Sequence, residues 1–156
     1  MAIRRILTKD EAVLHAKCRP VEKFDEKLHQ LLDDMIETLA KAQGVGLAAP
    51  QVGIRRRVAI IDLQEGEGAI ELVNPVILKK SGKQRDVEGC LSCPEQWGYV
   101  TRPNKCTVRA QDRNGETYEL TLEGLAARCA CHEIDHLDGK LFLDLVEEFV
   151  DPSEEE

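Results

Sequence analysis

The sequence predicts a single α+β domain with mainly antiparallel β-structure, and three observations support this fold class. An amphipathic helical pattern lies near the amino terminus, a series of short apolar and β-branched segments follows it, and a second helical pattern comes last. This order of helix, strands and helix is typical of an α+β domain. A chain of 156 residues is also long enough for one domain with one core.

Two helices are expected in the amino-terminal part of the chain. Thr8 to Glu11 matches a capping box, which predicts that a short helix begins there. Pro20 should end this helix, because the residue before a proline avoids the α region. The second pattern is clearer, with leucine, isoleucine and methionine recurring at helical spacing, and it predicts a helix from about Asp25 to Ala42. A glycine-punctuated loop should follow from Gln43.

The middle of the chain is predicted to form strands. They are expected at residues 58–61, 70–78 with an interruption at Asn74-Pro75, 99–101, 105–110 and 118–122. Arg113-Asn114-Gly115 predicts a hairpin between the last two strands, because Asn-Gly supplies positive φ at low cost. A second long helix is expected from about Gly124 to Asp138, with Gly139 as its C-terminal cap.

The net charge of −8 is concentrated at the carboxyl terminus. No lysine or arginine follows Lys140, whereas the last ten residues hold six acids: Glu147, Glu148, Asp151, Glu154, Glu155 and Glu156. We therefore expect one nearly neutral domain at residues 1–146 and an acidic tail at residues 147–156. A net-acidic chain is also a poor candidate for broad nucleic-acid binding.

The sequence favours a cytoplasmic protein. No apolar run approaches the ~18 residues that a membrane span needs, and the first fifteen residues lack a hydrophobic signal core. Six cysteines are many for such a chain, namely Cys18, Cys90, Cys93, Cys106, Cys129 and Cys131. Because the chain is large enough to fold without disulfides, we expect reduced thiols or metal ligands.

The strongest functional signal is an H-E-x-x-H pattern inside the second long helix, from His132 to His136. Residues four apart share one helical face, so both imidazoles can reach one metal ion, and Glu133 can contact a water on that ion. A catalytic metal needs about three protein ligands and one open position. Cys90, which follows a glycine, is the best third ligand; alternatively it is a small buried apolar residue.

Cys93 opens a competing interpretation. Cys90-x-x-Cys93 with His132 and His136 resembles a four-ligand structural zinc site, which would be closed and inactive. The 38 residues between Cys93 and His132 are many for a small zinc finger, and such a site gives Glu133 no role. A two-thiol redox motif is a further alternative, but its usual βαβ context is missing.

The segment from Gly44 to Gln51 has two glycines and two alanines before Pro50, and so leaves backbone with little side-chain cover. Such a strip can lie against an extended peptide, and Gln51 can point an amide donor at a developing oxyanion. By itself this segment is weak support, because a Gly/Ala loop after a helix is commonly only a turn.

Together these segments resemble the peptide deformylase family. That family carries a G-x-G-x-A-A-x-Q strip, an E-G-C-x-S turn and an H-E-x-x-H-x-x-G helix in this order, and the chain matches them at residues 44–51, 88–92 and 132–139. The resemblance extends from about Ile6 to Asp144. It implies antiparallel sheets packed around a central helix that bears the H-E-x-x-H motif.

The resemblance also implies a reaction and the residues that perform it. The family removes the N-formyl group from the formyl-methionine end of new proteins and releases formate. Cys90, His132 and His136 would bind one divalent metal, with Fe(II) as the usual ion and Zn, Ni or Co as replacements. Glu133 would be the general acid and base, and Gln51 with the Leu91 N–H would form the oxyanion hole. The expected substrate-binding residues are Gly44, Val45, Gly46, Glu88, Gly89 and Arg128.

The family further implies nascent formyl-methionyl polypeptides as partners, with the ribosome near its exit tunnel, a bacterial cytosolic location and a monomer. Three residues depart from the family's usual pattern. Cys131 stands where glutamine is usual, Arg128 where an apolar residue often lines the methionine pocket, and Cys93 where an aliphatic residue is common. Arg128 is expected either to turn outward or to alter the pocket rim, and Cys93 to have no part in the chemistry. An inactive or altered-specificity relative stays a further alternative.

Overall fold

The computed structural model describes residues 2–150 and contains two antiparallel sheets around one central helix. One sheet has the order β1-β2-β3-β6-β7 and the other β4-β5-β8. The strands are β1 (Gly46–Ala48), β2 (Val58–Ile61), β3 (Ile70–Ser81), β4 (Gln84–Cys90), β5 (Cys93–Arg102), β6 (Lys105–Gln111), β7 (Thr117–Glu123) and β8 (Glu148–Val150). The helices are α1 (Glu26–Ala42) and α2 (Leu125–Leu137), with short 3-10 turns η1 (Ala12–His15), η2 (Ala49–Val52) and η3 (Phe142–Asp144).

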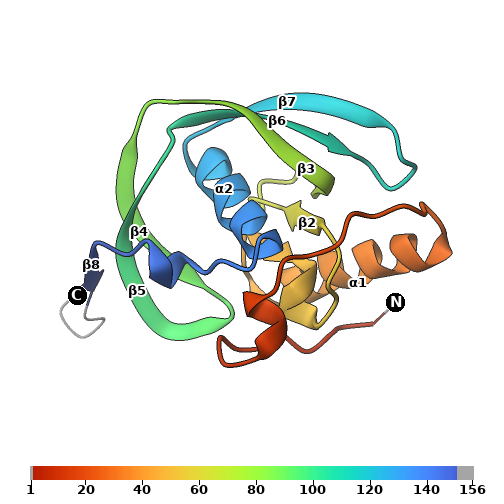
Figure 1. Cartoon of the computed structure of the whole chain (residues 1–156), viewed down its shortest axis with the longest axis horizontal. Coiled ribbons are helices and arrows are strands. Elements are labelled where there is room, and N and C mark those ends of the chain that lie inside the picture. Colours follow the sequence, from red (N-terminus) through yellow and green to blue (C-terminus); the bar gives the residue numbers. More distant parts are fainter. Residues whose placement is uncertain (1, 151–156) are drawn as a thin grey trace.

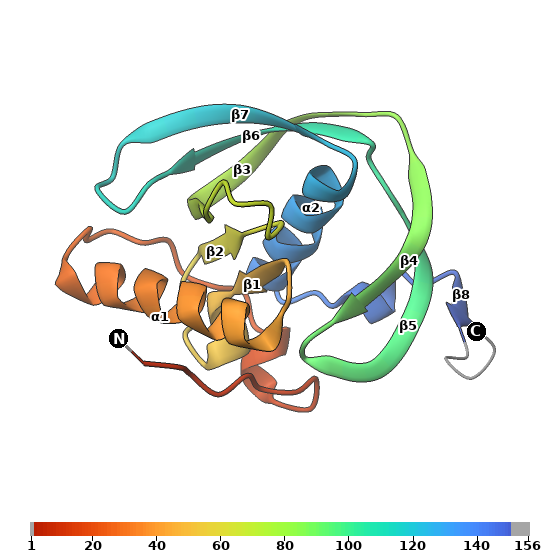
Figure 2. The same ribbon diagram turned by 180° about the vertical axis from the view of Figure 1, so that it is seen from behind.

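The two sheets are joined at a corner. β3 continues into β4 through a turn at Gly82, and β5 continues into β6 through Asn104, so one long hairpin bends and belongs to both sheets. Figures 1 and 2 show this band curving around α2, with α1 on the side of β1 and β2. The predicted α+β fold class, with antiparallel sheets around a central helix, is confirmed.

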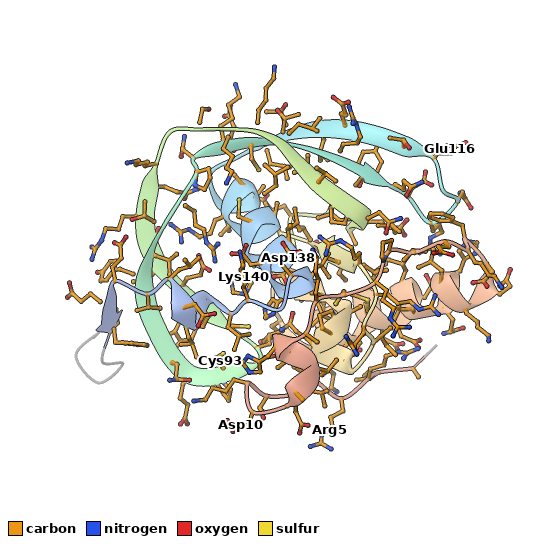
Figure 3. All side chains as sticks on the ribbon, in the orientation of Figure 1. Arg5, Asp10, Cys93, Glu116, Asp138 and Lys140 are labelled. Atoms are coloured by element: carbon orange, nitrogen blue, oxygen red, sulfur yellow. The ribbon has the colours of Figure 1, made fainter. Side chains whose placement is uncertain are left out.

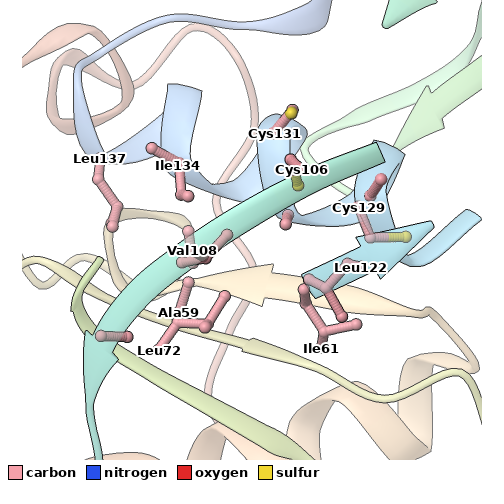
Figure 4. Close-up of a cluster of buried hydrophobic side chains, with 14 of the residues drawn as sticks. Ala59, Ile61, Leu72, Cys106, Val108, Leu122, Cys129, Cys131, Ile134 and Leu137 are labelled. Atoms are coloured by element: carbon pink, nitrogen blue, oxygen red, sulfur yellow. The ribbon is translucent and has the colours of Figure 1, made fainter. Parts of the chain in front are cut away.

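The core follows from the apolar faces of these elements. One buried cluster joins α2 to the larger sheet, where Ile134 and Leu137 pack with residues of β2, β3 and β6 (Figure 4). A second cluster joins the leucine face of α1 to β1 and β2, and a third lies between β5 and η3. α2 is therefore enclosed on several sides, and the groups it carries are removed from water. None of the described helices is long and apolar enough to cross a membrane.

Most predicted elements are present, and the boundaries of the long helices are close to those expected. Asp25 caps α1 by accepting a hydrogen bond from the Leu28 N–H. The interruption predicted in β3 is a register shift at Asn74, which has φ of 51° and whose side chain binds the backbone of Val21.

The helix predicted from the Thr8–Glu11 capping box was wrong. Only the 3-10 turn η1 forms, and Glu11 provides no side-chain cap. The Leu7 and Lys9 N–H groups donate instead to carbonyls of Gln51 and Ser92. These long-range bonds hold the segment extended. The few residues left before Pro20 would form too short a helix to offset the unfavourable free energy of helix nucleation.

Three strands were missed by sequence reasoning: β1, β4 and β8. β1 and β8 have three residues each, too few for a visible alternation, and β4 is mostly polar. β8 begins inside the segment expected to be an acidic tail and pairs with β5, whereas residues 151–156 of that segment lie outside the described part. Charged side chains such as those of Arg5, Asp10 and Glu116 lie at the periphery (Figure 3).

Candidate active site

Helix α2 presents the two histidines of the H-E-x-x-H motif on one face. His132 and His136 are both buried, and their ring centroids are 5.0 Å apart. Burial and the neighbouring His132 hold the pKa of His136 well below its ordinary value, which favours the neutral imidazole that binds metal ions.

Cys90 comes from the end of β4 and completes a cluster of three potential ligands. Its Sγ is 3.3 Å from His136 Nε2, and the ligand atoms of Cys90, His132 and His136 all lie within 4.8 Å of one another. A hydrogen bond with the Cys93 thiol, burial and the charge of Glu133 raise the pKa of the Cys90 thiol, and a divalent cation is the kind of group that offsets this effect. One sulfur and two imidazole nitrogens suit Zn²⁺ or Fe(II), so the donor set fits the metal that the motif predicts.

Glu88 orients the first of these histidines. Its Oε1 accepts a hydrogen bond of 2.6 Å from His132 Nδ1, which leaves Nε2 for a metal ion. Arg102 donates to both carboxylate oxygens, and Arg128 Nη1 lies 2.6 Å from Oε2. Although burial acts to raise it, the hydrogen bonds from His132 and Arg102 hold the pKa of Glu88 well below its ordinary value. Both carboxylate oxygens are thus taken up by protein partners.

Glu133 lies beside the cluster in a water-poor environment. Burial raises the pKa of its carboxyl group to about 7, and Oε1 has no hydrogen-bond partner among the described residues. Its Oε2 faces Gly46 of β1 so closely that a Cβ at position 46 would be 2.5 Å from this oxygen. The conformation of Glu133 therefore depends on the glycine that the motif supplies there.

Gln51 is held with its amide nitrogen toward Cys90. Its Oε1 accepts from the Ala48 N–H at 2.9 Å, which fixes the orientation of the amide group. Nε2 then donates to Ser92 Oγ at 3.1 Å and lies 3.6 Å from Cys90 Sγ. A buried amide donor thus points at the region where the three ligands meet.

These groups open into one cavity of about 430 Å³ between β1 and β4. Every predicted site residue except His136 lines this cavity, that is Gly44, Val45, Gly46, Gln51, Glu88, Gly89, Cys90, Leu91, Arg128, His132 and Glu133. His136 lies fully buried. The indole of Trp97 forms part of the cavity rim and packs on Gly89, where a Cβ would be 2.3 Å from the ring.

The three residues that depart from the usual family pattern lie in three different environments. Cys131 turns away from the cavity into the core, where it belongs to the same buried cluster as Cys106 of β6 (Figure 4). Cys93 is buried against Cys90 but is not part of the ligand cluster. Arg128 does not turn outward, since it is 4% exposed and bound to Glu88.

Sequence reasoning gave no role to Arg102, whose guanidinium also donates to Asp135 Oδ2 at 2.7 Å. A lone arginine at the end of a strand usually reaches solvent, so no local pattern indicated that it would be buried at a metal site. Ser92, inside the second motif, was likewise not recognised as a partner of Gln51.

Comparison with known proteins decides the family. The model of the family described as polypeptide deformylase matches residues 3–151. The chain belongs to the polypeptide deformylase family. It is 58% identical to a peptide deformylase of Caldicellulosiruptor bescii, over all of this chain and 92% of that protein. It is 46% identical to peptide deformylase 1 of Bacillus subtilis, over 96% of this chain and 93% of that one.

Solved structures agree with this family membership. A peptide deformylase from Legionella pneumophila superposes with a TM-score of 0.90 at 46% identity, covering 93% of this chain and 86% of that one. The enzyme from Thermotoga maritima gives 0.89 at 42% identity, covering 93% and 98%. The chain is therefore a metal-dependent hydrolase that removes the N-formyl group from newly made polypeptides, the reaction that the family name denotes.

Proposed function

We propose that the chain releases formate from formyl-methionyl polypeptides in the cavity between β1 and β4, with Glu133 as the general acid and base. The observation that carries this proposal is the convergence of three ligand atoms within 4.8 Å of one another beside a buried carboxyl group, at one end of an open cavity. A catalytic centre needs such an open side, whereas a structural metal site is closed by its protein ligands.

Cys90, His132 and His136 would hold one divalent metal, with Fe(II) as the native ion and Zn, Ni or Co as substitutes. Such an ion would supply Lewis-acid polarisation and a water of lowered pKa. The position of Cys93 supports this assignment over the structural zinc site, because its thiol lies outside the ligand cluster and packs with Leu14 and Val100.

Glu133 would accept the proton of the attacking water and then deliver it to the leaving nitrogen. A pKa of about 7 suits both steps, because a group near the operating pH is an effective base and an effective acid. The formamide is a stable amide, so its nitrogen must be protonated before it leaves as an amine. A carboxyl group that is dry and free of a competing partner at Oε1 is well suited to this transfer.

Gln51 Nε2 and the Leu91 N–H would stabilise the oxygen that becomes negative as the formyl carbon turns tetrahedral. Gln51 is held by Ala48, so its donor is already oriented and needs little reorganisation. Donors of this kind contribute on the order of 3 kcal/mol each at comparable sites.

The substrate peptide would bind as an added strand. β1 and β4 are edge strands of their sheets, and both line the cavity through Gly46 and Gly89. The peptide would pair with the backbone edges of these strands, because the space above Gly46 and Gly89 is taken by Glu133 and Trp97. The methionine side chain would enter the cavity, where Val45, Leu125 and Trp97 offer apolar surface.

Nascent polypeptides leaving the ribosome would be the natural partners, with the protein acting as a cytoplasmic monomer close to the exit tunnel. The near-neutral body supports an uncharged formyl-methionine end as the group that is recognised. The acidic carboxyl terminus is a poor surface for ribosomal RNA, so ribosome contact would have to use another face of the protein.

Formate release from formyl-Met-Ala-Ser, measured anaerobically with Fe(II) or Ni(II), tests the proposal. We expect turnover in the wild type and almost none in Glu133→Ala, with one metal ion bound per chain in both. Activity in the Glu133→Ala variant would contradict the assigned base. A well-metallated wild type without turnover would contradict the assigned reaction and favour an inactive or altered relative.

A further inference from the structure

Arg128 takes part in a group of four charges, in which Glu88 and both arginines are buried and the Asp135 side chain is 25% exposed. Arg102 is shared between Glu88 and Asp135, since its Nη2 and Nη1 each donate at 2.7 Å to one of the two carboxylates. Arg128 Nη1 adds a second guanidinium to Glu88 at 2.6 Å. With both arginines present, two positive charges balance two negative ones. Without Arg128, a single guanidinium would have to serve two carboxylates at a site where uncompensated charge is costly.

Arg128 is also fixed rigidly. Its Nη2 donates to the carbonyls of Gln84 and Val100 at 3.0 Å each, so the side chain of one α2 residue is tied to both β4 and β5. A guanidinium with five donors in a planar fork can bind a carboxylate and two carbonyls at once, which an ammonium group cannot do with the same geometry. The Arg128 side chain is 5% exposed, so water offers little competition.

Glu88 links Arg128 to the metal site, because it binds both Arg128 and the metal-ligand residue His132. The oxygen opposite the one held by Arg128 accepts the 2.6 Å hydrogen bond from His132 Nδ1. A carboxylate held at this nitrogen selects the tautomer whose Nε2 can bind a metal, and it fixes the plane of the ring. Arg128 lies four residues before His132 on α2, so both side chains are on the face that meets Glu88.

We propose that Arg128 is a positioning residue that, with Arg102, clamps Glu88 and thereby holds His132 in its metal-binding orientation. The residue does not serve as a charged contact for the substrate. Its Nη1 and Nη2 are taken by Glu88 and two carbonyls, and its Nε is buried without a hydrogen-bond partner among the described residues. No guanidinium nitrogen is therefore left at the surface of the cavity that Arg128 lines, and the substrate would meet its methylene stem. The proposal rests on the metal site assigned above, and it concerns how firmly that site holds its ion.

Arg128→Met tests this directly, because methionine keeps an unbranched apolar stem and removes the guanidinium. We expect the rate at which Ni(II) or Co(II) passes to a chelator to rise about tenfold, the lower end of the range for outer-shell partners, because Arg102 still holds Glu88. The visible ligand-field bands of the Co(II) protein should shift as the His132 ring loses its fixed orientation. KM for formyl-Met-Ala-Ser should stay within about twofold, since the stem remains.

Two further variants are measured beside Arg128→Met, one intermediate and one control. Arg128→Lys keeps the charge without the fork, so its metal-release rate should fall between those of the wild type and Arg128→Met, and it provides the measurement if the methionine variant does not fold. Arg109→Met is the matched control, because within residues 2–150 the only ion pair of Arg109 is an exposed one with Glu119. Its release rate and Co(II) spectrum should equal those of the wild type.

A double-mutant cycle tests whether Arg128 acts on His132 through Glu88 or has only a general structural role. In a Glu88→Gln background, Arg128→Met should give no further acceleration of metal release, because the charge that Arg128 holds is already absent. The same tenfold factor in that background would overturn the proposal. So would unchanged release and an unchanged spectrum in both Arg128 variants, even with a lowered Tm of the metal-free protein. A wild type that binds no metal would instead contradict the metal site itself.

Discussion

Gly46 shows how strictly one residue controls the reactive group. A methyl group at this position would lie 2.5 Å from Glu133 Oε2, well inside contact distance, so the carboxylate would have to move. Gly46→Ala should therefore lower kcat about 100-fold, since a shift of about 1 Å in a reacting group has effects of this size. Formate release measures this, and metal analysis should still find one ion per chain.

Gly44→Ala is the matched comparison for Gly46→Ala. Its Cβ would meet methyl groups of Leu39 and Leu91 at 2.9 and 3.0 Å, and such flexible side-chain ends can adjust. We expect a much smaller loss of kcat there. Equal losses of kcat in the two variants would show that the effect of Gly46→Ala comes from general crowding of the backbone and not from displacement of the Glu133 carboxylate.

Gln51 offers a second residue-level prediction. Gln51→Met keeps the length of the side chain but removes the donor that lies near Cys90 and Ser92. We expect kcat to fall by about 10²–10³-fold with little change in KM, because an oxyanion donor acts mainly in the transition state. A rise in KM with unchanged kcat would instead show that Gln51 acts in ground-state binding of the substrate.

At the scale of elements, contact between β4 and β5 shapes the cavity rim. Trp97 packs on Gly89 with no room for a side chain there. Gly89→Ala should displace the indole, which is 45% exposed, and move its emission maximum to longer wavelength. Trp97 is the only tryptophan in the chain, so the emission spectrum reports on the surroundings of this indole alone. Gln96→Ala in the same strand is the control and should leave the emission maximum unchanged.

The amino terminus of α1 depends on its cap. Asp25→Ala removes the acceptor for the Leu28 N–H and should lower the free energy of unfolding by about 1 kcal/mol. Urea unfolding measures this, with Glu22→Ala outside the helix as the control. Because α1 contributes none of the groups assigned to chemistry, kcat should not change. A loss of activity would show that α1 packing controls the position of β1.

For the whole molecule, β8 extends the paired structure beyond residue 146. Glu147 binds Arg85 and Thr101, and Phe149 pairs with Gly98 of β5. Removing residues 147–156 should therefore lower Tm relative to removing residues 151–156 alone. Thermal unfolding of the two truncated proteins measures this. Equal Tm values would support the boundary that the charge pattern predicts, after residue 146.

The sequence by itself determined the long amphipathic helix, the Asn-Gly hairpin, the α+β class and the chemistry of the three motifs. These features are local, since helical periodicity, turn conformation and the spacing of His132 and His136 depend on residues close together in the chain. Only the tertiary structure decided the rest. β1 and β8 exist because edges of other strands pair with them. The capping box at Thr8 forms no helix because the neighbouring N–H groups donate to the carbonyls of Gln51 and Ser92. Arg128 is inside the protein because Glu88 lies opposite it. In each case the deciding partner is far away in sequence, and burial makes its contact strong enough to override the local preference.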